Sequence, residues 1–136
     1  MTKQEITSLL RTRGIQPTQQ RIAVLDYLMA HRTHPTADTL YRALVEEFPT
    51  FSRTTVYNTA RTLAKAGLIR VITIDAEEQR FDAGMEQHGH FRCTDCGSIF
   101  DFPISQQAMQ NLSPASYTPV TMEVYATGVC PHCQQQ

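Results

Sequence analysis

Two kinds of metal-binding side chain are concentrated between residues 82 and 101 of this 136-residue chain. Cys93 and Cys96 form a C-x-x-C pair of thiols, and His88 and His90 stand two residues apart just before it. Side chains two residues apart point to the same side of an extended strand, so both imidazoles can face one ion. Sulfur is a soft ligand, whereas nitrogen and oxygen are harder, which indicates two separate sites with different tasks.

A second C-x-x-C pair, Cys130 and Cys133, follows the first after 33 intervening residues. Two such pairs can place four thiolates in a tetrahedron, the geometry that Zn(II) adopts with Zn–S bonds of about 2.3 Å. We expect a structural zinc site that contributes directly to folding. A disulfide or a redox pair is the alternative, which a reducing compartment disfavours. His132 could replace a cysteine, but four thiolates already complete the shell.

The two histidines are accompanied by further nitrogen and oxygen ligands. Asp82 precedes them, Asp101 follows them, and His34 stands before a predicted helix. A single histidine is usually an ordinary surface residue, but three with two aspartates fit a mixed site for Fe(II), Mn(II) or Zn(II). Because the affinity order favours Zn(II), occupancy by Fe(II) or Mn(II) would depend on geometry and supply.

Four helices are expected in the first half of the chain, and His34 precedes the third of them. The first covers residues 3–13 and stops at Gly14, and the others begin at the N-cap candidates Thr18, Thr36 and Ser52. Gly67 ends the fourth, Pro49 ends the third, and His31 is interpreted as a C-terminal residue of the second rather than a ligand. Periodicity predicts the inward faces to be Ile6, Leu9 and Leu10; Ile22, Leu25, Leu28 and Met29; Ala37, Leu40, Tyr41, Leu44, Val45 and Phe48; and Val56, Ala60, Leu63 and Ala64.

A predicted β-hairpin follows the fourth helix, with strands in LIRVITI and QRF and a turn at DAEE. Helices followed by such a hairpin form a winged helix-turn-helix. Arg can pair with guanine, Asn with adenine, and Thr and Tyr can reach phosphate or the thymine methyl group. A merely solvated helix face is the alternative, and the hairpin favours DNA binding. The candidate DNA contacts are Arg53, Thr54, Thr55, Tyr57, Asn58 and Arg61.

The second half is predicted to be a separate α/β unit. We expect a DNA-binding domain over residues 1–81, a linker over 82–88 that is flexible at Gly84, and a dimerisation and zinc-binding domain over 89–136. Two strands meet at the first C-x-x-C pair. The unit is small for a core of its own, and metal binding and oligomerisation are the usual remedies. The expected inward residues are Ile104, Ala108 and Leu112 on a helix and Val120, Met122 and Val124 on a long strand over 118–129.

Charge and hydropathy agree with this division. Residues 1–80 hold 11 Lys/Arg and 8 Asp/Glu, whereas residues 81–136 hold 1 Arg and 5 Asp/Glu. The mildly basic first half permits nucleic-acid binding. The sequence has no apolar run of membrane-spanning length and no signal-peptide core, so we expect a soluble cytoplasmic protein.

These motifs together resemble the ferric uptake regulator family over nearly the whole chain. The resemblance implies an α+β fold, with an N-terminal winged helix-turn-helix and a small C-terminal α/β dimerisation domain with a four-cysteine zinc site. It implies a homodimeric, metal-dependent transcriptional repressor that binds a palindromic double-stranded DNA operator and no membrane. The motifs that carry it are Gly14, Pro17–Arg21, His34–Thr36, Thr54–Asn58, Gly67–Ile69, Arg80–Asp82, His88-x-His90-x2-Cys93-x2-Cys96-Gly97 and Cys130-x2-Cys133.

Within that family the chain is most similar to the peroxide-sensing branch. The resemblance implies a regulatory Fe(II) or Mn(II) site and Fe(II)-catalysed oxidation of a histidine ligand by hydrogen peroxide, with His34 and His88 as the susceptible residues. Iron-sensing members commonly have Glu at the positions of Asp82 and Asp101. The matching regulatory ligands are His34, Asp82, His88, His90 and Asp101.

Two other functions stay open on the sequence. One is a regulator of the same family that senses iron, manganese or zinc instead of peroxide. The other is a metalloenzyme that uses the His/Asp site, although the sequence shows no separate nucleophile or substrate motif. Two departures from the family pattern matter. Gln16 lacks the positive charge that often enters the minor groove, and Gln87 and Gly89 replace ligands of an additional metal site.

Overall fold

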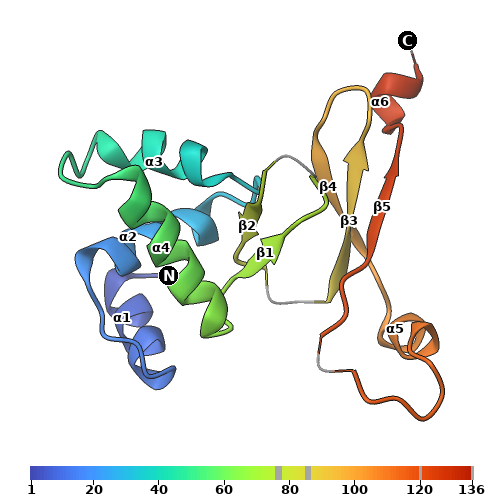
Figure 1. Cartoon of the computed structure of the whole chain (residues 1–136), viewed down its shortest axis with the longest axis horizontal. Coiled ribbons are helices and arrows are strands. Elements are labelled where there is room, and N and C mark those ends of the chain that lie inside the picture. Colours follow the sequence, from blue (N-terminus) through green and yellow to red (C-terminus); the bar gives the residue numbers. More distant parts are fainter. Residues whose placement is uncertain (76–77, 85–86, 120, 136) are drawn as a thin grey trace. The chain divides into compact units, whose positions relative to one another are not determined.

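The computed structural model describes residues 1–136 apart from 76–77, 85–86, 120 and 136. The chain forms two compact units, Met1–Met85 (unit 1) and Glu86–Gln136 (unit 2). Among the described residues, unit 1 holds four helices and a two-stranded sheet, and unit 2 holds a three-stranded sheet with two short helices (Figure 1). In the described part of the chain, no helix has the length and apolarity needed to cross a membrane.

Side-chain caps start each helix of unit 1. The predicted caps Thr18, Thr36 and Ser52 each accept a hydrogen bond from the backbone N–H three residues later. Thr2 caps the first helix in the same way and forms a reciprocal capping box with Glu5, a feature that the sequence analysis missed. The helices are α1 (Lys3–Thr12), α2 (Gln19–Ala30), α3 (Ala37–Val45) and α4 (Arg53–Lys65).

The helix ends follow local backbone chemistry. Gly14 and Gly67 have φ of 73° and 76°, a left-handed conformation that glycine adopts at little cost, and both act as the predicted stops. The third helix ends at Val45, before the predicted end at Pro49. The prediction was wrong there because Pro49 prevents helix continuation without requiring that the helix reach it.

The core of unit 1 lies between these helices. It includes Ile6, Leu10, Leu40, Val56, Ala60 and Leu63, as the periodicity predicted. The expected face of α2 was partly wrong: Ala23 and Val24 are buried, whereas Ile22 and Met29 are only partly buried. Because α2 contacts α1, α3 and α4, its buried surface is broader than the single stripe of a helix packed on one side.

A short antiparallel hairpin completes unit 1 and confirms the winged helix-turn-helix. Strand β1 (Arg70–Ile72) pairs with β2 (Arg80–Asp82), with Arg70 opposite Asp82. Strand β1 is shorter than the run LIRVITI that predicted it, whereas β2 has the length of the predicted QRF and lies one residue later. Residues 76–77 of the predicted turn lie outside the described residues.

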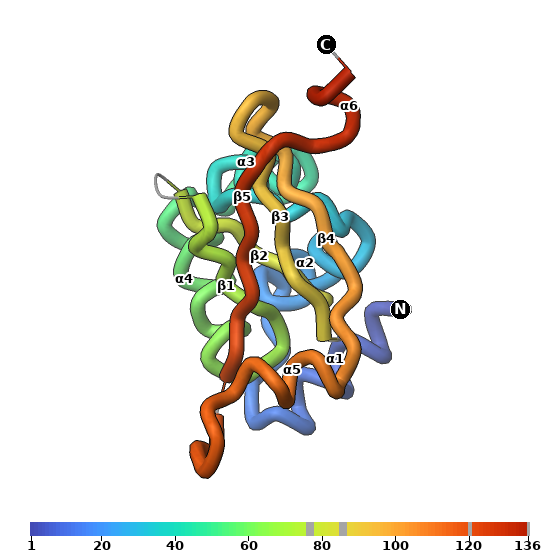
Figure 2. Tube along the Cα trace, turned by 90° about the vertical axis from the view of Figure 1, so that its right-hand side faces the viewer, coloured from blue at the N-terminus to red at the C-terminus, as the bar shows by residue number. Residues whose placement is uncertain are grey.

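Unit 2 is built on a sheet with the strand order β4-β3-β5, which is seen nearly face-on in Figure 2. The central strand β3 (His88–Cys93) pairs antiparallel with β4 (Ile99–Pro103) through the predicted C-x-x-C turn. It pairs in parallel with β5 (Tyr125–Gly128), which the sequence did not indicate. A parallel neighbour needs a crossover, and the segment containing α5 (Gln106–Leu112) provides it before α6 (Pro131–Gln134) ends the unit.

Two predictions about unit 2 were wrong. On α5, Met109 is the buried residue, whereas Ala108 and Leu112 are not part of a buried face and Ile104 lies before the helix. The N-cap at Ser105 starts the helix later than expected, so Met109 is the residue that faces inward. The long strand expected over 118–129 is reduced to β5, with Met122 and Val124 partly buried before it and Val120 outside the described residues.

Candidate metal centres

The four cysteines of unit 2 come together where β3 ends and α6 begins. Cys93 is the last residue of β3, Cys96 lies in the turn to β4, and Cys130 is the N-cap residue of α6. The Sγ atoms of Cys93, Cys96, Cys130 and Cys133 all lie within 4.8 Å of one another.

The spacing of these sulfurs suits a tetrahedral metal ion. Zn–S bonds of about 2.3 Å place the sulfurs of a tetrahedral site about 3.8 Å apart. The Sγ atoms of Cys96 and Cys130 are 4.0 Å apart, and none of the four cysteines forms a disulfide. Sulfur donors with this clustering fit Zn(II), so the structure supports a zinc site of four cysteines over a disulfide.

Backbone groups prepare one of these thiols for metal binding. The N–H groups of Cys96 and Cys130 point at the Cys93 sulfur, at 3.5 and 3.4 Å, and these hydrogen bonds lower the pKa of Cys93 to about 6. The Ser98 hydroxyl lowers the pKa of Cys96, whereas the adjoining Cys130 thiol raises the pKa of Cys133. Cys93 and Cys96 therefore ionise more readily than an ordinary thiol, whereas Cys133 ionises less readily.

A second donor group lies in unit 2 at the opposite end of β3. His88 and His90 project from the same face of the strand, and Asp101 of β4 is the register partner of His90. The two Nε2 atoms are 3.0 Å apart and lie 3.5 and 3.4 Å from Asp101 Oδ1. These distances show three predicted ligands directed at one small region. Gly89 between them faces Phe102, and a Cβ at this position would overlap the aromatic ring.

Unit 1 brings together the other two predicted nitrogen and oxygen ligands. An antiparallel bridge joins Thr36 to Arg80, and the Phe81 N–H donates to the Pro35 carbonyl at 2.9 Å. This register places His34 beside Asp82, and their ligand atoms lie within 4.8 Å of each other. His34 has φ of 57°, a conformation that is uncommon for a residue with a side chain and that occurs more often at functional sites.

An arginine that the sequence analysis missed holds Asp82. Arg32 Nε lies 3.2 Å from Asp82 Oδ1, and the Gly84 N–H donates to the same oxygen at 2.9 Å. Arg32 belongs to none of the motifs identified in the sequence, and no local spacing connects it to a residue 50 positions away. The one sequence signal was that Arg32 stands two residues before the predicted ligand His34, which could have suggested a role near the metal site.

The polar face of α4 carries the six candidate DNA contacts. Arg53, Thr54, Asn58 and Arg61 are exposed, whereas Thr55 and Tyr57 are half-buried. Thr55 takes part in the N-cap of α4. Its N–H donates to the Ser52 hydroxyl, and the Ser52 hydroxyl donates to the Thr55 hydroxyl. Arg61 donates to the Tyr57 hydroxyl at 3.2 Å, so these two side chains form one unit on the helix surface.

Comparison with models of known protein families gives a match over most of the chain. A family model described as the ferric uptake regulator family matches residues 12–125. The chain belongs to the ferric uptake regulator family. Members of the family are DNA-binding regulators that form dimers, so DNA binding and dimer formation apply to this chain at the family level.

Individual members of the Fur family match over almost the whole chain. The peroxide-responsive repressor PerR of Staphylococcus aureus strain Mu50 is 38% identical over 138 residues, covering 98% of this chain and 92% of that protein. A solved structure of Streptococcus pyogenes PerR, concerned with peroxide sensing and gene regulation, is 31% identical, covers 97% and 92% of the two chains and has a TM-score of 0.55. Helicobacter pylori Fur shares the fold, with 22% identity, coverage of 100% and 96%, and a TM-score of 0.81.

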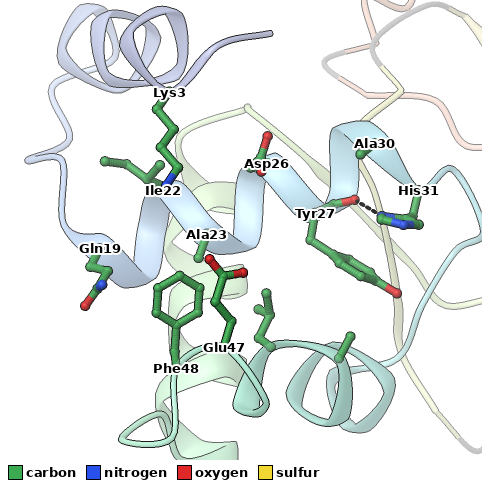
Figure 3. Close-up of a pocket in the computed structure, with 12 residues that line it drawn as sticks. Lys3, Gln19, Ile22, Ala23, Asp26, Tyr27, Ala30, His31, Glu47 and Phe48 are labelled. Carbon is green, nitrogen blue, oxygen red and sulfur yellow. Dashed lines mark hydrogen bonds between the residues drawn. The ribbon is translucent and has the colours of Figure 1, made fainter.

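A cleft of about 540 Å³ in unit 1 of this Fur-family chain involves none of the predicted ligands. It lies between α2 and the end of α3, and Figure 3 shows Glu47 beside the ring of Phe48, with Asp26 on α2. His31 lines the cleft, and its Nδ1 lies 3.1 Å from the Tyr27 carbonyl oxygen. That contact agrees with the interpretation of His31 as a helix C-terminal residue and not a metal ligand.

Proposed function

We propose that this protein is a metal-dependent transcriptional repressor that senses peroxide through oxidation of a histidine ligand. Its support is a donor set distributed over both units: His34 and Asp82 in unit 1, and His88, His90 and Asp101 in unit 2. Nitrogen and oxygen donors of this kind fit Fe(II) or Mn(II). The 38% identical S. aureus relative is a peroxide-responsive repressor, which favours this sensing function over iron, manganese or zinc sensing.

The proposed mechanism depends on the distribution of the ligands along the chain. Five donors bound to one ion would hold the winged helix of unit 1 at a fixed angle to the sheet of unit 2. We propose residues 1–81 as the DNA-binding domain, 82–88 as the hinge and 89–136 as the dimerisation domain. In a homodimer the hinge angle would set the spacing of the two recognition helices, and a palindromic operator is bound well only at a matching spacing. Coupling of this kind typically amounts to about 1–3 kcal/mol.

Peroxide would act through the histidines. Fe(II) held by the proposed ligands would supply the redox catalysis that cleaves the O–O bond of hydrogen peroxide, with no net change in its own oxidation state. A ring carbon of His34 or His88 would gain one peroxide oxygen, and the second peroxide oxygen would leave as water. An oxidised ring is a poorer ligand, so the two units would lose their common attachment and the dimer would leave its operator.

The DNA contacts are proposed to come from the exposed side of α4. Arg53, Thr54, Asn58 and Arg61 would reach base edges or phosphates, with Thr55 and Tyr57 positioned behind them. We propose no enzymatic turnover, because five ligands can fill the shell of the ion and the relatives are regulators. A repressor acts where its operator lies, so a cytoplasmic location is part of the proposal.

Mass spectrometry tests the sensing step. The protein is loaded with Fe(II) or Mn(II), treated with hydrogen peroxide and digested with trypsin. The peptide of residues 33–42 contains His34 as its only histidine, whereas that of residues 81–92 contains His88, His90 and Met85. Fragment ions must therefore separate histidine oxidation from methionine oxidation. We expect a gain of one oxygen on His34 or His88 with Fe(II) and none on either with Mn(II). Equal oxidation with both metals, or none, would reject peroxide sensing and favour a metal sensor.

Operator binding tests the ligand assignment separately. His88→Ala should abolish the metal-dependent part of operator binding, because it removes one of three donors in unit 2. His132→Ala is the matched control, since His132 lies beside the cysteines and not in the proposed regulatory site. Metal-dependent binding that survives in His88→Ala would contradict the assignment.

A further inference from the structure

Arg32 and Asp82 form an ion pair within unit 1 at the proposed regulatory ligand. Arg32 Nε lies 3.2 Å from Asp82 Oδ1, and the side chains are 38% and 1% exposed. The Gly84 N–H donates to the same carboxylate oxygen at 2.9 Å. A carboxylate that is proposed to bind a divalent ion is therefore already in contact with a cation that belongs to the chain.

Gly84 leaves room for that cation. A Cβ at this position would overlap the Arg32 guanidinium group and would also approach Asp82 Oδ2. The glycine therefore supplies both a hydrogen bond to the carboxylate and the space beside it. Arg32, from the loop after α2, therefore matches Asp82 at the end of β2 in charge, and Gly84 provides the space that the guanidinium occupies.

We propose that Arg32 is a built-in counter-cation that competes with the regulatory metal for Asp82. Without metal, the guanidinium neutralises the buried carboxylate. With metal, a positive charge beside Asp82 repels the divalent ion and weakens its binding. Arg32 thereby raises the metal concentration at which the regulatory site fills. This inference rests on the proposed function, because it requires Asp82 to be a ligand.

A purely structural role for Arg32 makes the opposite prediction. If the guanidinium only orients the carboxylate, its removal should leave Asp82 less well positioned and weaken metal binding. If it competes, its removal should strengthen metal binding. The sign of the change in affinity therefore distinguishes the two roles.

Titration with Mn(II) measures that sign. Zinc-loaded full-length protein is titrated while the electron paramagnetic resonance signal of free Mn(II) reports the unbound ion. For Arg32→Gln we expect a Kd lower than that of the wild type by about tenfold, as removal of a neighbouring like charge favours cation binding. Arg32→Lys, which keeps the charge, should stay close to the wild type. Arg11→Gln removes the same charge from the exposed surface of α1 and should change nothing.

Gly84→Ala provides a second variant that keeps the arginine. The added Cβ would displace the guanidinium from Asp82, so Mn(II) should again bind more tightly than in the wild type. Thermal unfolding gives an independent measurement. Without Mn(II), Arg32→Gln should melt at a lower temperature because the buried carboxylate loses its counter-charge. The rise in melting temperature on saturation with Mn(II) should be larger than in the wild type.

Asp82→Asn separates this inference from the proposed function. If Asp82→Asn binds Mn(II) as the wild type does, Asp82 is not a ligand and the ligand set itself is wrong. If Asp82→Asn loses Mn(II) binding while Arg32→Gln and Gly84→Ala bind it equally or more weakly than the wild type, the ligand set stands and competition by Arg32 is overturned.

Discussion

Asp38 on α3 forms an ion pair with Arg53, the first residue of α4. The same guanidinium group lies over the ring of Tyr41, 4.6 Å from its centroid. One of the proposed DNA contacts is therefore held by two side chains of the neighbouring helix before DNA arrives. Arg53 must either keep this geometry on DNA or exchange Asp38 for a phosphate or a base.

Asp38→Asn should loosen the discrimination of the operator from other DNA. Loss of the carboxylate removes a negative charge near the DNA-facing helix and releases Arg53 from its orientation. We expect binding to a scrambled duplex to rise about threefold at low salt, while the ratio of operator to scrambled affinity falls. Fluorescence anisotropy over a series of salt concentrations measures both quantities. Asp26→Asn, on α2 beside the cleft, is the charge-matched control, and a similar change there would remove any special role for Asp38.

Asn58→Ala should weaken operator binding in a sequence-dependent manner. Asn58 is exposed in the middle of α4, and a bidentate Asn–adenine contact is worth about 1–3 kcal/mol of discrimination. Competition assays with operators changed one base pair at a time should reveal a position at which the variant no longer discriminates. Asn111→Ala, on the exposed surface of α5, should bind like the wild type. Uniform weakening at all positions would assign Asn58 to the phosphate backbone instead.

Zinc retention should fall as the pH falls. The N–H groups around Cys93 lower the pKa of its thiol from 9.0 to about 6, so the folded state favours the thiolate. That contribution to stability is present above the unfolded pKa of 9.0 and is lost as the pH falls through about 6. Protons also compete with the metal for every thiolate. A chromogenic chelator should therefore remove zinc faster as the pH is lowered from about 7.5 to about 5.

Two variants serve as the unaffected control and the zinc-losing control for this experiment. His132→Ala should retain zinc with the pH profile of the wild type, because four sulfurs already cluster without it. Cys96→Ser should lose zinc at every pH tested and should unfold unit 2 at a lower temperature. Retention of zinc that does not change with pH would show that these sulfurs are not the ligands.

Gly89→Ala should destabilise unit 2. The new methyl group would overlap the Phe102 ring on the neighbouring strand, and overpacking typically costs about 1–3 kcal/mol. The same substitution in the background of Phe102→Leu should cost much less, since the ring that opposes the methyl group is gone. Thermal unfolding of the four zinc-loaded proteins gives the coupling energy. Additive effects of the two substitutions would mean that the Cβ is accommodated by another movement.

Much of the fold followed from local sequence chemistry. The caps Thr18, Thr36 and Ser52 and the stops Gly14 and Gly67 could be predicted because each acts within a few residues of itself. The family resemblance, confirmed by the match over residues 12–125, came from motifs that are likewise short. The inward phase of α5 could not be predicted reliably, because seven residues carry too little periodicity to fix it.

The candidate sites divide in the same way. The sequence by itself determined which ligands are present: two C-x-x-C pairs, an H-x-H and their flanking acids, whose types and spacings are local properties. Only the tertiary structure decided that β5 lies parallel to β3, that Arg32 holds Asp82, and that Asp38 holds Arg53. The physical reason is that such contacts join residues far apart in the chain. They depend on how whole helices and strands pack, which no short stretch of sequence specifies.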